Sequence, residues 1–572
     1  MKQGAREWIV LGITVASIGA FFHYREATTA VGEQAEYPRD AVTKNQAPPP
    51  PFPTRPSYKA TATLDLAKPG HTISDGIYGV CNLPSDKLRD YGIAVTRWGG
   101  NTSSRYNWKI NADNGANDWY FKNRGTPIRD LTETAYLKHL QTARAIQATT
   151  YQTVPMLGWV AKDHQSHAFP VRRHGPQKHT EPNHADVGNG VRIDGKPIRD
   201  VDPRETSIAA GPDFVAEAVA FVSKHAGRAD GQGVKYWVLD NEPMLWHQTH
   251  RDVRAEPLGY DELWERTVRY AEAIKQTDPT AKVAGFCSWG WTDLFFSAKD
   301  EGNDGYATQR DCRNHGGEPL GEWFIRKCGE YQKKHGQPLI DVFDFHWYPQ
   351  CEAKGKSPHM GRGMDVDFNE LRLRSTRDLW DPIYTQESWI RSTVDKCPTQ
   401  VIRRVRQWIE RHNPSMEICL GEYNFGGSDN ITGGLAQADA FGILASEKVD
   451  LAFIWHTPEG TQDLAWQLFR NFDGAGGRFG ERHIDAKSLH SDLAIHAAKR
   501  KDGATTIAVI NKNLGGSCEF KVDAAGLKGD MRVWRFDQAS GGVVEISAEA
   551  KTIDGSIVLN LPAASASMIV VK

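Results

Sequence analysis

The sequence predicts an α/β protein, with a (β/α)8 TIM-like barrel followed by a C-terminal all-β sandwich domain. Three observations support this prediction. The chain has 572 residues, more than one compact core usually holds. Up to about residue 488, eight short apolar segments alternate with stretches of helical period. Beyond that point, short strand-like segments are separated by Gly- and Asp-rich turns.

The N-terminus has the pattern of an export signal. Lys2 and Arg6 precede an apolar run, Trp8–Phe22, which is shorter than the roughly 20 residues of a comfortable membrane span. The small residues Thr28–Ala30 offer a weak cleavage site, so an uncleaved N-terminal anchor is the alternative. We expect residues 1–30 to be a signal peptide or anchor, and the protein to be secreted or otherwise extracytoplasmic.

A stiff linker and a single strand come next. Residues 31–56 are polar and end in the proline run Pro48–Pro51, which is typical of an extended tether. Residues 57–70 contain alternating apolar and polar positions at Lys59–Leu66, the pattern of a strand. We expect this strand to complete the C-terminal sandwich.

Residues 71–488 form the predicted barrel. The expected strands are Ile77–Cys81, Val95–Gly99, Thr153–Gly158, Tyr236–Asp240, Val283–Ser288, Val342–Trp347, Ile418–Glu422 and Leu451–Trp455. The expected helices span about 131–148, 211–226, 259–276, 319–335, 399–412 and 434–447. Strand–helix alternation favours a parallel sheet, and eight units favour closure into a barrel. The strands are nearly all apolar, as strands covered on both faces must be.

Residues 489–572 form the predicted sandwich. Its expected strands are Leu493–Ala497, Thr505–Asn511, Cys518–Val522, Met531–Asp537 and Ser567–Val571. We favour a buttress for the barrel over a carbohydrate-binding module, because the fold alone does not specify binding.

Composition narrows the class of partner. The 69 basic residues balance 71 acidic ones, which gives no support for a nucleic-acid partner. The 18 Trp and 17 Tyr offer flat apolar faces on which sugar rings can stack. A neutral polysaccharide substrate fits both observations.

Neither the cysteines nor the histidines form a metal-binding motif. The eight cysteines contain no C-x-x-C pair; Cys312 with Cys328 and Cys351 with Cys397 could form disulfides in an oxidising compartment. Cys81, Cys287 and Cys419 lie in apolar runs and are expected to be buried free thiols. The insert at about 164–205 carries four histidines whose spacing favours solvated loop residues over metal ligands: His167, His174, His179 and His184.

Two glutamates stand at the carboxyl ends of predicted barrel strands, where barrel enzymes carry their chemistry. Glu242 follows Asn241 after strand four, and Glu422 ends strand seven. Glycosidic bond cleavage needs one carboxylic acid to protonate the leaving oxygen and one carboxylate at the anomeric carbon. We assign Glu242 as acid/base and Glu422 as nucleophile. Asn241 is expected to hydrogen-bond the sugar 2-OH.

Polar and aromatic residues occupy the ends of the other strands as well. Because barrel interiors favour branched aliphatic residues, rings at so many strand ends indicate a substrate cleft. The substrate-binding candidates are Asn241, Arg97, Trp98, Asn101, Trp159, Trp289, His346, Tyr348, Tyr423, Trp455 and Glu459.

Several ordered motifs resemble glycoside hydrolase family 44, the endoglucanase and xyloglucanase family. They are Arg97–Asn101, Arg105–Trp108, Asp118–Phe121, Gly158–Asp163, Asp240–Pro243, His346–Pro349, Tyr384 with Glu387–Trp389, Glu422–Asn424, Gly433–Asp439 and Asn471–Gly474. The resemblance spans about residues 77–512. It implies a barrel plus β-sandwich, internal cleavage of β-1,4-glucans such as xyloglucan, and a retaining mechanism. It also places Glu242 and Glu422 at the family's acid/base and nucleophile positions.

The resemblance leaves several alternatives open. The enzyme could act on another β-linked polysaccharide, such as xylan or mannan, or the barrel could bind polysaccharide without cleaving it. No cofactor is expected, although members of the family can hold structural calcium. A retaining mechanism predicts that the two carboxyl groups lie about 5–5.5 Å apart, whereas about 6.5–9.5 Å would indicate inversion.

Overall fold

The computed structural model describes residues 52–572, apart from 69, 82–85, 200, 354–356, 358–364, 395–397, 524–525, 528 and 554. The expected signal or anchor segment 1–30 and most of the expected linker 31–56 lie outside the described residues, as does Cys397. Within the described part of the chain, no helix is both long and apolar enough to span a membrane.

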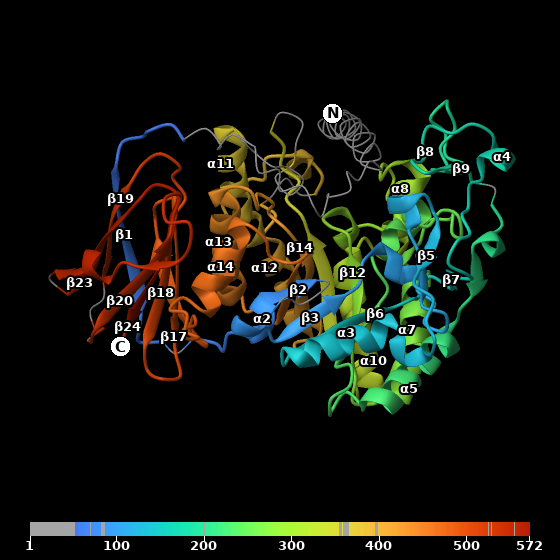
Figure 1. Cartoon of the computed structure of the whole chain (residues 1–572), viewed down its shortest axis with the longest axis horizontal. Coiled ribbons are helices and arrows are strands. Elements are labelled where there is room, and N and C mark those ends of the chain that lie inside the picture. Colours follow the sequence, from blue (N-terminus) through green and yellow to red (C-terminus); the bar gives the residue numbers. More distant parts are fainter. Residues whose placement is uncertain are drawn as a thin grey trace, which may run out of the picture.

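The main domain is a closed barrel of eight parallel strands that follow one another around the barrel in chain order (Figure 1). The strands are β2 (Gly79–Cys81), β3 (Val95–Trp98), β6 (Thr149–Val154), β11 (Tyr236–Leu239), β12 (Lys282–Ser288), β13 (Val342–Trp347), β14 (Glu417–Tyr423) and β15 (Leu451–Ile454). The predicted fold class, a (β/α)8 barrel with a C-terminal β domain, is therefore confirmed.

Helices cover the outside of the barrel. They include α3 (Ala135–Ala145), α5 (Pro212–Ala226), α7 (Tyr260–Thr277), α10 (Leu320–His335), α11 (Val366–Ser375), α12 (Val401–His412), α13 (Ile431–Ser446) and α14 (Thr461–Arg470). The six predicted helical stretches correspond to α3, α5, α7, α10, α12 and α13. The sequence analysis missed α11 and α14, each of only ten residues.

One strand prediction was wrong in position. The third barrel strand was expected at 153–158, but β6 spans Thr149–Val154. Pro155 has no N–H for a ladder hydrogen bond, so the strand ends before it. The next two backbone N–H groups, of Met156 and Leu157, donate instead to the carboxylate of Asp240.

The cysteine predictions had mixed outcomes. Cys81, Cys287 and Cys419 are free thiols, packed with apolar side chains inside the barrel, as predicted. The suggested disulfide between Cys312 and Cys328 is wrong, because both are free and buried. They pack as small apolar side chains in the core outside the barrel.

The β domain is one ten-stranded sheet that curls over a single apolar core. Its order is β21-β20-β24-β18-β17-β16-β1-β19-β23-β22. The strands are β1 (Tyr58–Asp65), β16 (Arg482–Ser488), β17 (Leu493–Lys499), β18 (Thr505–Asn511), β19 (Cys518–Asp523), β20 (Met531–Phe536), β21 (Val544–Glu545), β22 (Lys551–Ile553), β23 (Ser556–Leu561) and β24 (Ser565–Val571). In Figure 1, the blue β1 lies among the red C-terminal strands.

Strand β1 lies between strands from the far end of the chain. It pairs parallel with β19 and antiparallel with β16. Strand β16, a segment that the sequence analysis placed in the barrel domain, also pairs with β17 and so belongs to the β domain. The chain therefore enters and leaves the barrel through neighbouring strands.

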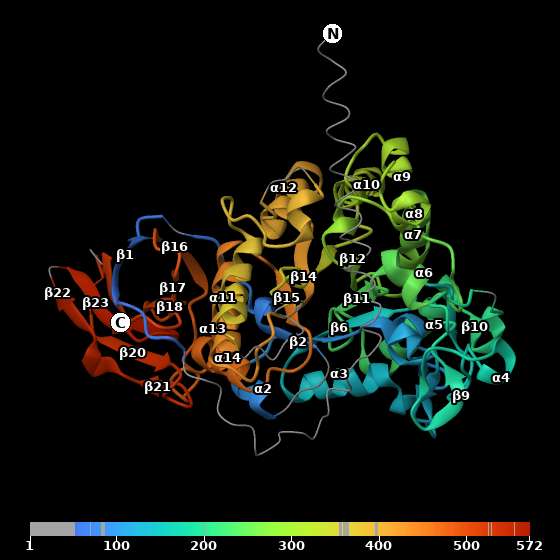
Figure 2. The ribbon, with the colours of Figure 1, turned by 90° about the horizontal axis from the view of Figure 1, so that it is seen from above.

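The β domain packs against α13 and α14 on one side of the barrel (Figure 2). Gly442 lies in α13, and a Cβ atom there would come within 2.0 Å of the His496 ring on β17. Nearby, the buried carboxylate of Asp439 contacts His496 at 3.0 Å and Lys512 Nζ at 3.0 Å. The two domains thus share a tight apolar contact and a buried ionic network.

An insert after the third barrel strand lies at the opposite end of the molecule from the β domain (Figures 1 and 2). It contains β7 (Trp159–Ala161), α4 (Val171–His174), β8 (Thr180–Glu181), β9 (His184–Gly188) and β10 (Ser207–Ala209). The preceding hairpin of β4 (Ala112–Asn114) and β5 (Asn123–Gly125) packs against this insert through the Lys122–Glu181 ion pair.

Candidate active site

A buried aspartate shapes the loop that carries Glu242. Directly after β11, the Asp240 carboxylate accepts hydrogen bonds from the Leu157 and Asn241 backbone N–H groups and from the Trp246 indole. Asp240 and Glu242 both have positive φ, +66° and +45°. Such strained backbone persists only where the surroundings hold it. The loop therefore fixes the direction in which Glu242 points.

A one-residue bulge sets the direction of Glu422. In the pairing of β13 with β14, Phe345 pairs with Leu420 but His346 pairs with Glu422, so Gly421 is the extra residue. Side chains before the bulge alternate, with Cys419 in the barrel interior and Leu420 in the outer core. Without the extra residue, Glu422 would face outward; with it, Glu422 faces the barrel interior.

Glu422 is buried among donors and positive charge. Its Oε1 accepts a 2.7 Å hydrogen bond from Arg97 Nη1, and its Oε2 accepts one of 2.9 Å from the Tyr348 hydroxyl. Burial by itself raises the pKa of Glu422. The charges of His346 and Arg97 and the hydrogen bonds from Arg97 and Tyr348 outweigh it and hold this pKa below the ordinary value. This environment keeps Glu422 ionised.

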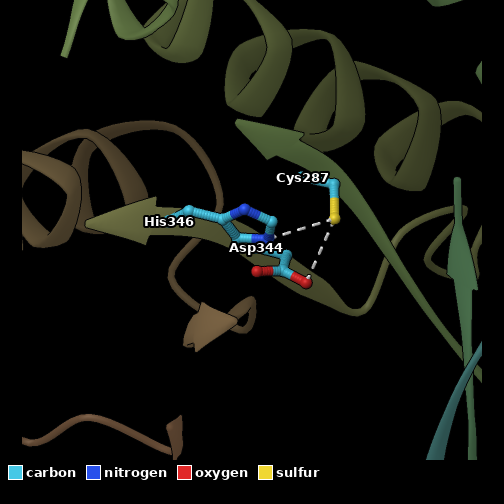
Figure 3. A group of neighbouring side chains, drawn as sticks. All are labelled: Cys287, Asp344 and His346. Carbon is cyan, nitrogen blue, oxygen red and sulfur yellow. Dashed lines mark hydrogen bonds between the residues drawn. The ribbon is translucent and has the colours of Figure 1, made fainter. Parts of the chain in front are cut away.

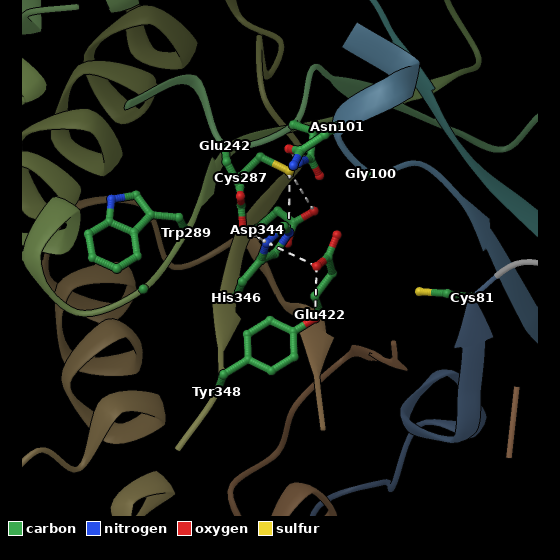
Figure 4. A network of polar contacts seen from close by, with 12 residues as sticks. Cys81, Gly100, Asn101, Glu242, Cys287, Trp289, Asp344, His346, Tyr348 and Glu422 are labelled. Carbon is green, nitrogen blue, oxygen red and sulfur yellow. Dashed lines mark hydrogen bonds and ion pairs between the residues drawn. The ribbon is translucent and has the colours of Figure 1, made fainter. Parts of the chain in front are cut away.

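His346 lies between the two glutamates (Figure 4). Its Nδ1 is 2.8 Å from Glu242 Oε1 and 3.6 Å from Glu422 Oε2. One carboxylate oxygen of each glutamate and a ring nitrogen of His346 all lie within 4.8 Å of one another. The structure thus brings together the two glutamates that the sequence placed on different strands.

A chain of amides connects this centre to the rim. Arg97 Nη2 donates to Asn241 Oδ1 at 3.0 Å, which orients the Asn241 amide because a guanidinium can only donate. Asn241 Nδ2 donates to Asn101, whose own amide donates to Asp118. Burial, foremost, raises the pKa of Asp118 to about 6. With its amide oriented in this way, Asn241 presents Nδ2 as a donor.

The predicted aromatic residues differ in their surroundings. Trp98 packs edge-on against two tyrosine rings of the core, and Trp159 and Trp289 are also half-buried against the core. The Trp455 ring lies under Arg97, with the guanidinium carbon 5.6 Å from the ring centroid. A Cβ atom at Gly100 would come within 2.6 Å of Trp455, so glycine allows this close approach.

Two predicted binding residues lie away from the two glutamates. Tyr423 follows the inward-facing Glu422 and therefore points outward, where its hydroxyl accepts a hydrogen bond from Gln437 of α13. Tyr423 is fully buried. Glu459 is exposed and contacts Ser428 on the loop after β14. We leave both out of the proposed site.

Sequence reasoning named Asp118 and Asp240 in motifs and Cys287 as a buried thiol, but it assigned no site role to them or to Asp344. A signal for Asp344 was present, because an aspartate inside the apolar run Val342–Trp347 has to face a polar environment. Its spacing of two from His346 places both on one face of β13. No local pattern predicts that Cys287 contacts them.

Three groups among the described residues have ligand atoms close enough to hold a metal ion. They are Cys287 with Asp344 and His346, Glu242 with His346 and Glu422, and Glu318 with Glu322 and His412. Each contains a nitrogen or sulfur ligand, whereas calcium takes oxygen ligands. The expectation of structural calcium stays a prediction. None of these groups includes a histidine of the insert; His167 and His184 lie near carboxylates there.

Comparison with known proteins identifies the family. Residues 112–351 match glycoside hydrolase family 44. Endoglucanase A of Paenibacillus lautus is 27% identical over 533 residues, covering 90% of this chain and 72% of that protein. The solved structure of CelM2, described as a bifunctional glucanase-xylanase from a metagenome library, is 31% identical, with a TM-score of 0.85 over 91% of this chain and 99% of that one. The chain belongs to glycoside hydrolase family 44.

The family gives the function class: this protein is an enzyme, a glycoside hydrolase of the endoglucanase and xyloglucanase family. A further member, the Paenibacillus polymyxa xyloglucanase solved with xyloglucan, is 25% identical with a TM-score of 0.74, over 90% of this chain and 99% of that one. The matched family segment contains Asn241, Glu242 and His346, while Glu422 lies beyond its end.

Proposed function

We propose that this protein is a retaining endo-β-1,4-glucanase that cleaves internal bonds of soluble or branched β-glucans such as xyloglucan, with Glu242 as acid/base and Glu422 as nucleophile. The observation that carries the proposal is the unequal environment of two neighbouring carboxyl groups. Glu422 is ion-paired with Arg97, a cation that stays charged at any working pH, whereas the ion pair that Glu242 makes within the described part of the chain is with the titratable His346.

The unequal environments support distinct roles. In the first step, Glu242 transfers its proton to the glycosidic oxygen while a Glu422 carboxylate oxygen bonds to the anomeric carbon. In the second step, Glu242 takes a proton from water, the water oxygen bonds to the anomeric carbon, and Glu422 leaves as a carboxylate. Two carboxyl groups and water balance both steps, so no cofactor is required.

The spacing of the carboxyl groups favours retention. One oxygen of each carboxyl group lies within 4.8 Å of one oxygen of the other, a spacing that suits the about 5–5.5 Å of retaining enzymes better than the about 6.5–9.5 Å of inverting enzymes. Direct attack by Glu422 needs the shorter separation. We therefore expect the first product released to keep the β configuration.

The test combines nucleophile variants with product analysis. Glu422→Gln is nearly isosteric and should lower kcat on xyloglucan by about 10⁴-fold, because the carboxylate that attacks is gone. Proton NMR during hydrolysis by the unmodified enzyme should show β anomers first. Near-normal turnover of Glu422→Gln would overturn the assigned roles, and α anomers first would overturn retention.

The internal mode of cleavage has its own measurement. Cuts within the chain lower the viscosity of dissolved polysaccharide much faster than reducing ends accumulate. If viscosity and reducing ends changed in step, the enzyme would be acting from chain ends instead.

Xylan is the second candidate substrate. It is favoured by the likeness to CelM2, which is described as a bifunctional glucanase-xylanase. A panel of xyloglucan, mixed-linkage glucan, xylan and mannan at equal concentration separates the candidates by kcat/KM. We expect xyloglucan to be the best substrate of the panel.

We further propose that the enzyme acts outside the cytoplasm, on polysaccharide as its partner. The support is the basic residues Lys2 and Arg6 before the apolar run Trp8–Phe22. N-terminal sequencing of protein recovered from the medium and from membranes tests cleavage. A mature terminus near Ala30 supports a signal peptide, and an intact Met1 in membranes supports an anchor.

A further inference from the structure

Three buried side chains form a cluster in the barrel interior (Figure 3), and one of them, His346, contacts both Glu242 and Glu422. Cys287 comes from β12, and Asp344 and His346 come from β13. Cys287 Sγ lies 3.6 Å from Asp344 Oδ2 and 3.7 Å from His346 Nε2. All three are fully buried. The proposed function names His346 as the contact of Glu242 but gives no role to Cys287 or Asp344.

The chemistry of each group decides which atom donates the hydrogen in each contact of this cluster. The Tyr151 hydroxyl donates to Asp344 Oδ2 at 2.7 Å, and the Cys287 thiol donates to the same oxygen. A thiol has one hydrogen, so the sulfur can only accept from His346. His346 Nε2 must then carry a hydrogen. Its other nitrogen, Nδ1, faces the carboxylate oxygens of Glu242 and Glu422 and carries one as well.

The surroundings of His346 favour this doubly protonated form. Burial opposes the charge, but the negative charge of Glu422 and the hydrogen bond to Glu242 outweigh it and raise the pKa of His346. Among the described residues, the other titratable or charged groups that interact with the ring or with the two glutamates include Arg97, Cys287, Asp344, Tyr348, Asp293, Asp118 and Cys81. Arg97 opposes the charge on His346.

The backbone at Cys287 is distorted in a way that serves this contact. In the pairing of β12 with β13, Phe286 pairs with Asp344 and Ser288 with Phe345, so Cys287 is an extra residue. Phe286 and Cys287 both have positive φ, +80° and +49°. Without the bulge, Cys287 would face the outer helices instead of the barrel interior. Strain of this kind is concentrated at functional sites.

We propose that Cys287 and Asp344 are positioning residues that keep His346 protonated on both nitrogens and donating from Nδ1 to Glu242 Oε1. This inference rests on the proposed role of Glu242 as acid/base. With Oε1 occupied by an incoming hydrogen bond, the catalytic proton of Glu242 is carried on Oε2. His346 and the residues behind it therefore decide which oxygen of Glu242 is the acid.

The same arrangement serves both chemical steps. When the enzyme is glycosylated, the negative charge moves from Glu422 to Glu242. His346 Nδ1, at 3.6 Å from one carboxylate and 2.8 Å from the other, lies beside the charge in both states. Cys287 contacts the other ring nitrogen, Nε2, and not the nitrogen that faces the two glutamates.

The test compares two aryl β-cellotriosides that differ only in the leaving group. Phenol needs protonation by Glu242 to leave, whereas 2,4-dinitrophenol leaves without it. In Cys287→Ala, kcat/KM for glycosylation with the phenyl substrate should fall about tenfold or more, while that with the dinitrophenyl substrate stays within about threefold. Cys287→Ser, which keeps a donor and an acceptor, should recover part of the loss. Asp344→Asn should resemble Cys287→Ala.

The dependence of kcat/KM on pH gives a second measurement. A purely structural role of Cys287 would leave this profile unchanged. In Cys287→Ala, His346 Nε2 loses its acceptor, so we expect His346 to become neutral. A neutral His346 no longer lowers the pKa of Glu422, and the acid limb of the kcat/KM profile should therefore move to higher pH. Cys328→Ala removes a buried thiol from α10, far from the site, and is the control for loss of packing alone. Circular dichroism and urea unfolding show whether each variant is folded.

Three outcomes decide between the proposals. The first outcome is an equal loss of kcat/KM on both aryl substrates together with an unchanged acid limb. If a folded Cys287→Ala or Cys287→Ser variant behaved in this way, the positioning role would be overturned. Unchanged rates on both substrates would overturn it as well. Glu242→Gln separates this from the proposed function: if it keeps full activity on the phenyl substrate, the acid/base assignment itself fails, whatever the Cys287 variants do.

Discussion

At the scale of single residues, Arg97 has the largest number of roles at the site. Its fully buried guanidinium donates to Glu422 through Nη1 and to Asn241 through Nη2, and it lies over the Trp455 ring. The planar guanidinium of Arg97 therefore fixes the position of Glu422 relative to Asn241, the residue that precedes Glu242. A lysine carries the same charge but cannot donate in two fixed directions.

The first prediction at this scale concerns Arg97 variants. Arg97→Lys should lower kcat by roughly 10²-fold, because misplacement of the nucleophile by about 1 Å has that effect. Arg97→Met also removes the charge that lowers the pKa of Glu422. Since Glu422 must be ionised to attack, the acid limb of the kcat/KM profile should move to higher pH. Measurement of kcat/KM from pH 3 to 8 checks this, and an acid limb that stays in place would contradict it.

At the scale of elements, two bulges, on the strands that flank β13, organise the interior face of the barrel. Cys287 is the extra residue on β12 and Gly421 is the extra residue on β14, on either side of the regular strand β13. Each bulge reverses the alternation of the residues that follow it. The result is that side chains from three strands converge on His346 instead of alternating between the interior and the helices.

Gly421 gives a prediction at this scale. A Cβ atom at this position would lie 2.0 Å from Asp344 Oδ1, so Gly421→Ala has to displace either β14 or the Asp344 side chain. We expect a loss of about 1–3 kcal/mol in the free energy of unfolding and a drop in kcat. Urea unfolding and steady-state kinetics measure the two effects.

The matched control for this variant is Gly542→Ala. Its added Cβ would meet no atom within 4 Å, and its backbone conformation suits any residue. It should leave both stability and kcat unchanged. If Gly421→Ala behaved in the same way, the close approach of Gly421 to Asp344 would not constrain the strand.

At the scale of the whole molecule, the β domain and the barrel are joined by a buried ionic network. Asp439 of α13 contacts His496 on β17, Lys512 after β18, and the Thr376 hydroxyl at 2.6 Å. Burial by itself raises the pKa of Asp439, but Lys512 and His496 outweigh it and hold this pKa well below the ordinary value. These contacts support the buttress role expected for the β domain.

Asp439→Asn tests this network. The variant leaves Lys512 buried without its counter-charge, so the free energy of unfolding at pH 7 should fall by about 3–5 kcal/mol. Because the folded-state pKa of Asp439 is depressed, its contribution is present above the ordinary aspartate pKa of about 3.9 and is lost as pH falls through the lower folded value. The difference between Asp439→Asn and the unmodified enzyme should therefore shrink at low pH. Urea unfolding at pH 7 measures the loss of stability, and the same experiment at pH 3 measures how far the loss shrinks.

Glu545→Gln is the control for this experiment. It removes an exposed ion pair with Arg532 in the β domain and should change stability little. A stability loss for Asp439→Asn no greater than that of Glu545→Gln would show that the interface does not depend on the ionic network.

Some properties of this enzyme were determined by the sequence itself. The number of barrel strands, the approximate positions of seven of them and six of the outer helices follow from the period of apolar residues, which is a local property of the chain. The positions of Glu242 and Glu422 at the ends of strands four and seven follow from the same pattern. The prediction that Cys81, Cys287 and Cys419 are buried free thiols also followed from their positions in apolar runs.

Other properties were decided only by the tertiary structure. A bulge depends on how a strand pairs with its neighbours, so no local period shows that Cys287 and Glu422 turn inward while Tyr423 turns outward. The pairing of β1 with β16 and β19, more than 400 residues away in the chain, is likewise a long-range choice. The sequence supplied the two carboxyl groups, and the packing of strands around His346 gave them different environments.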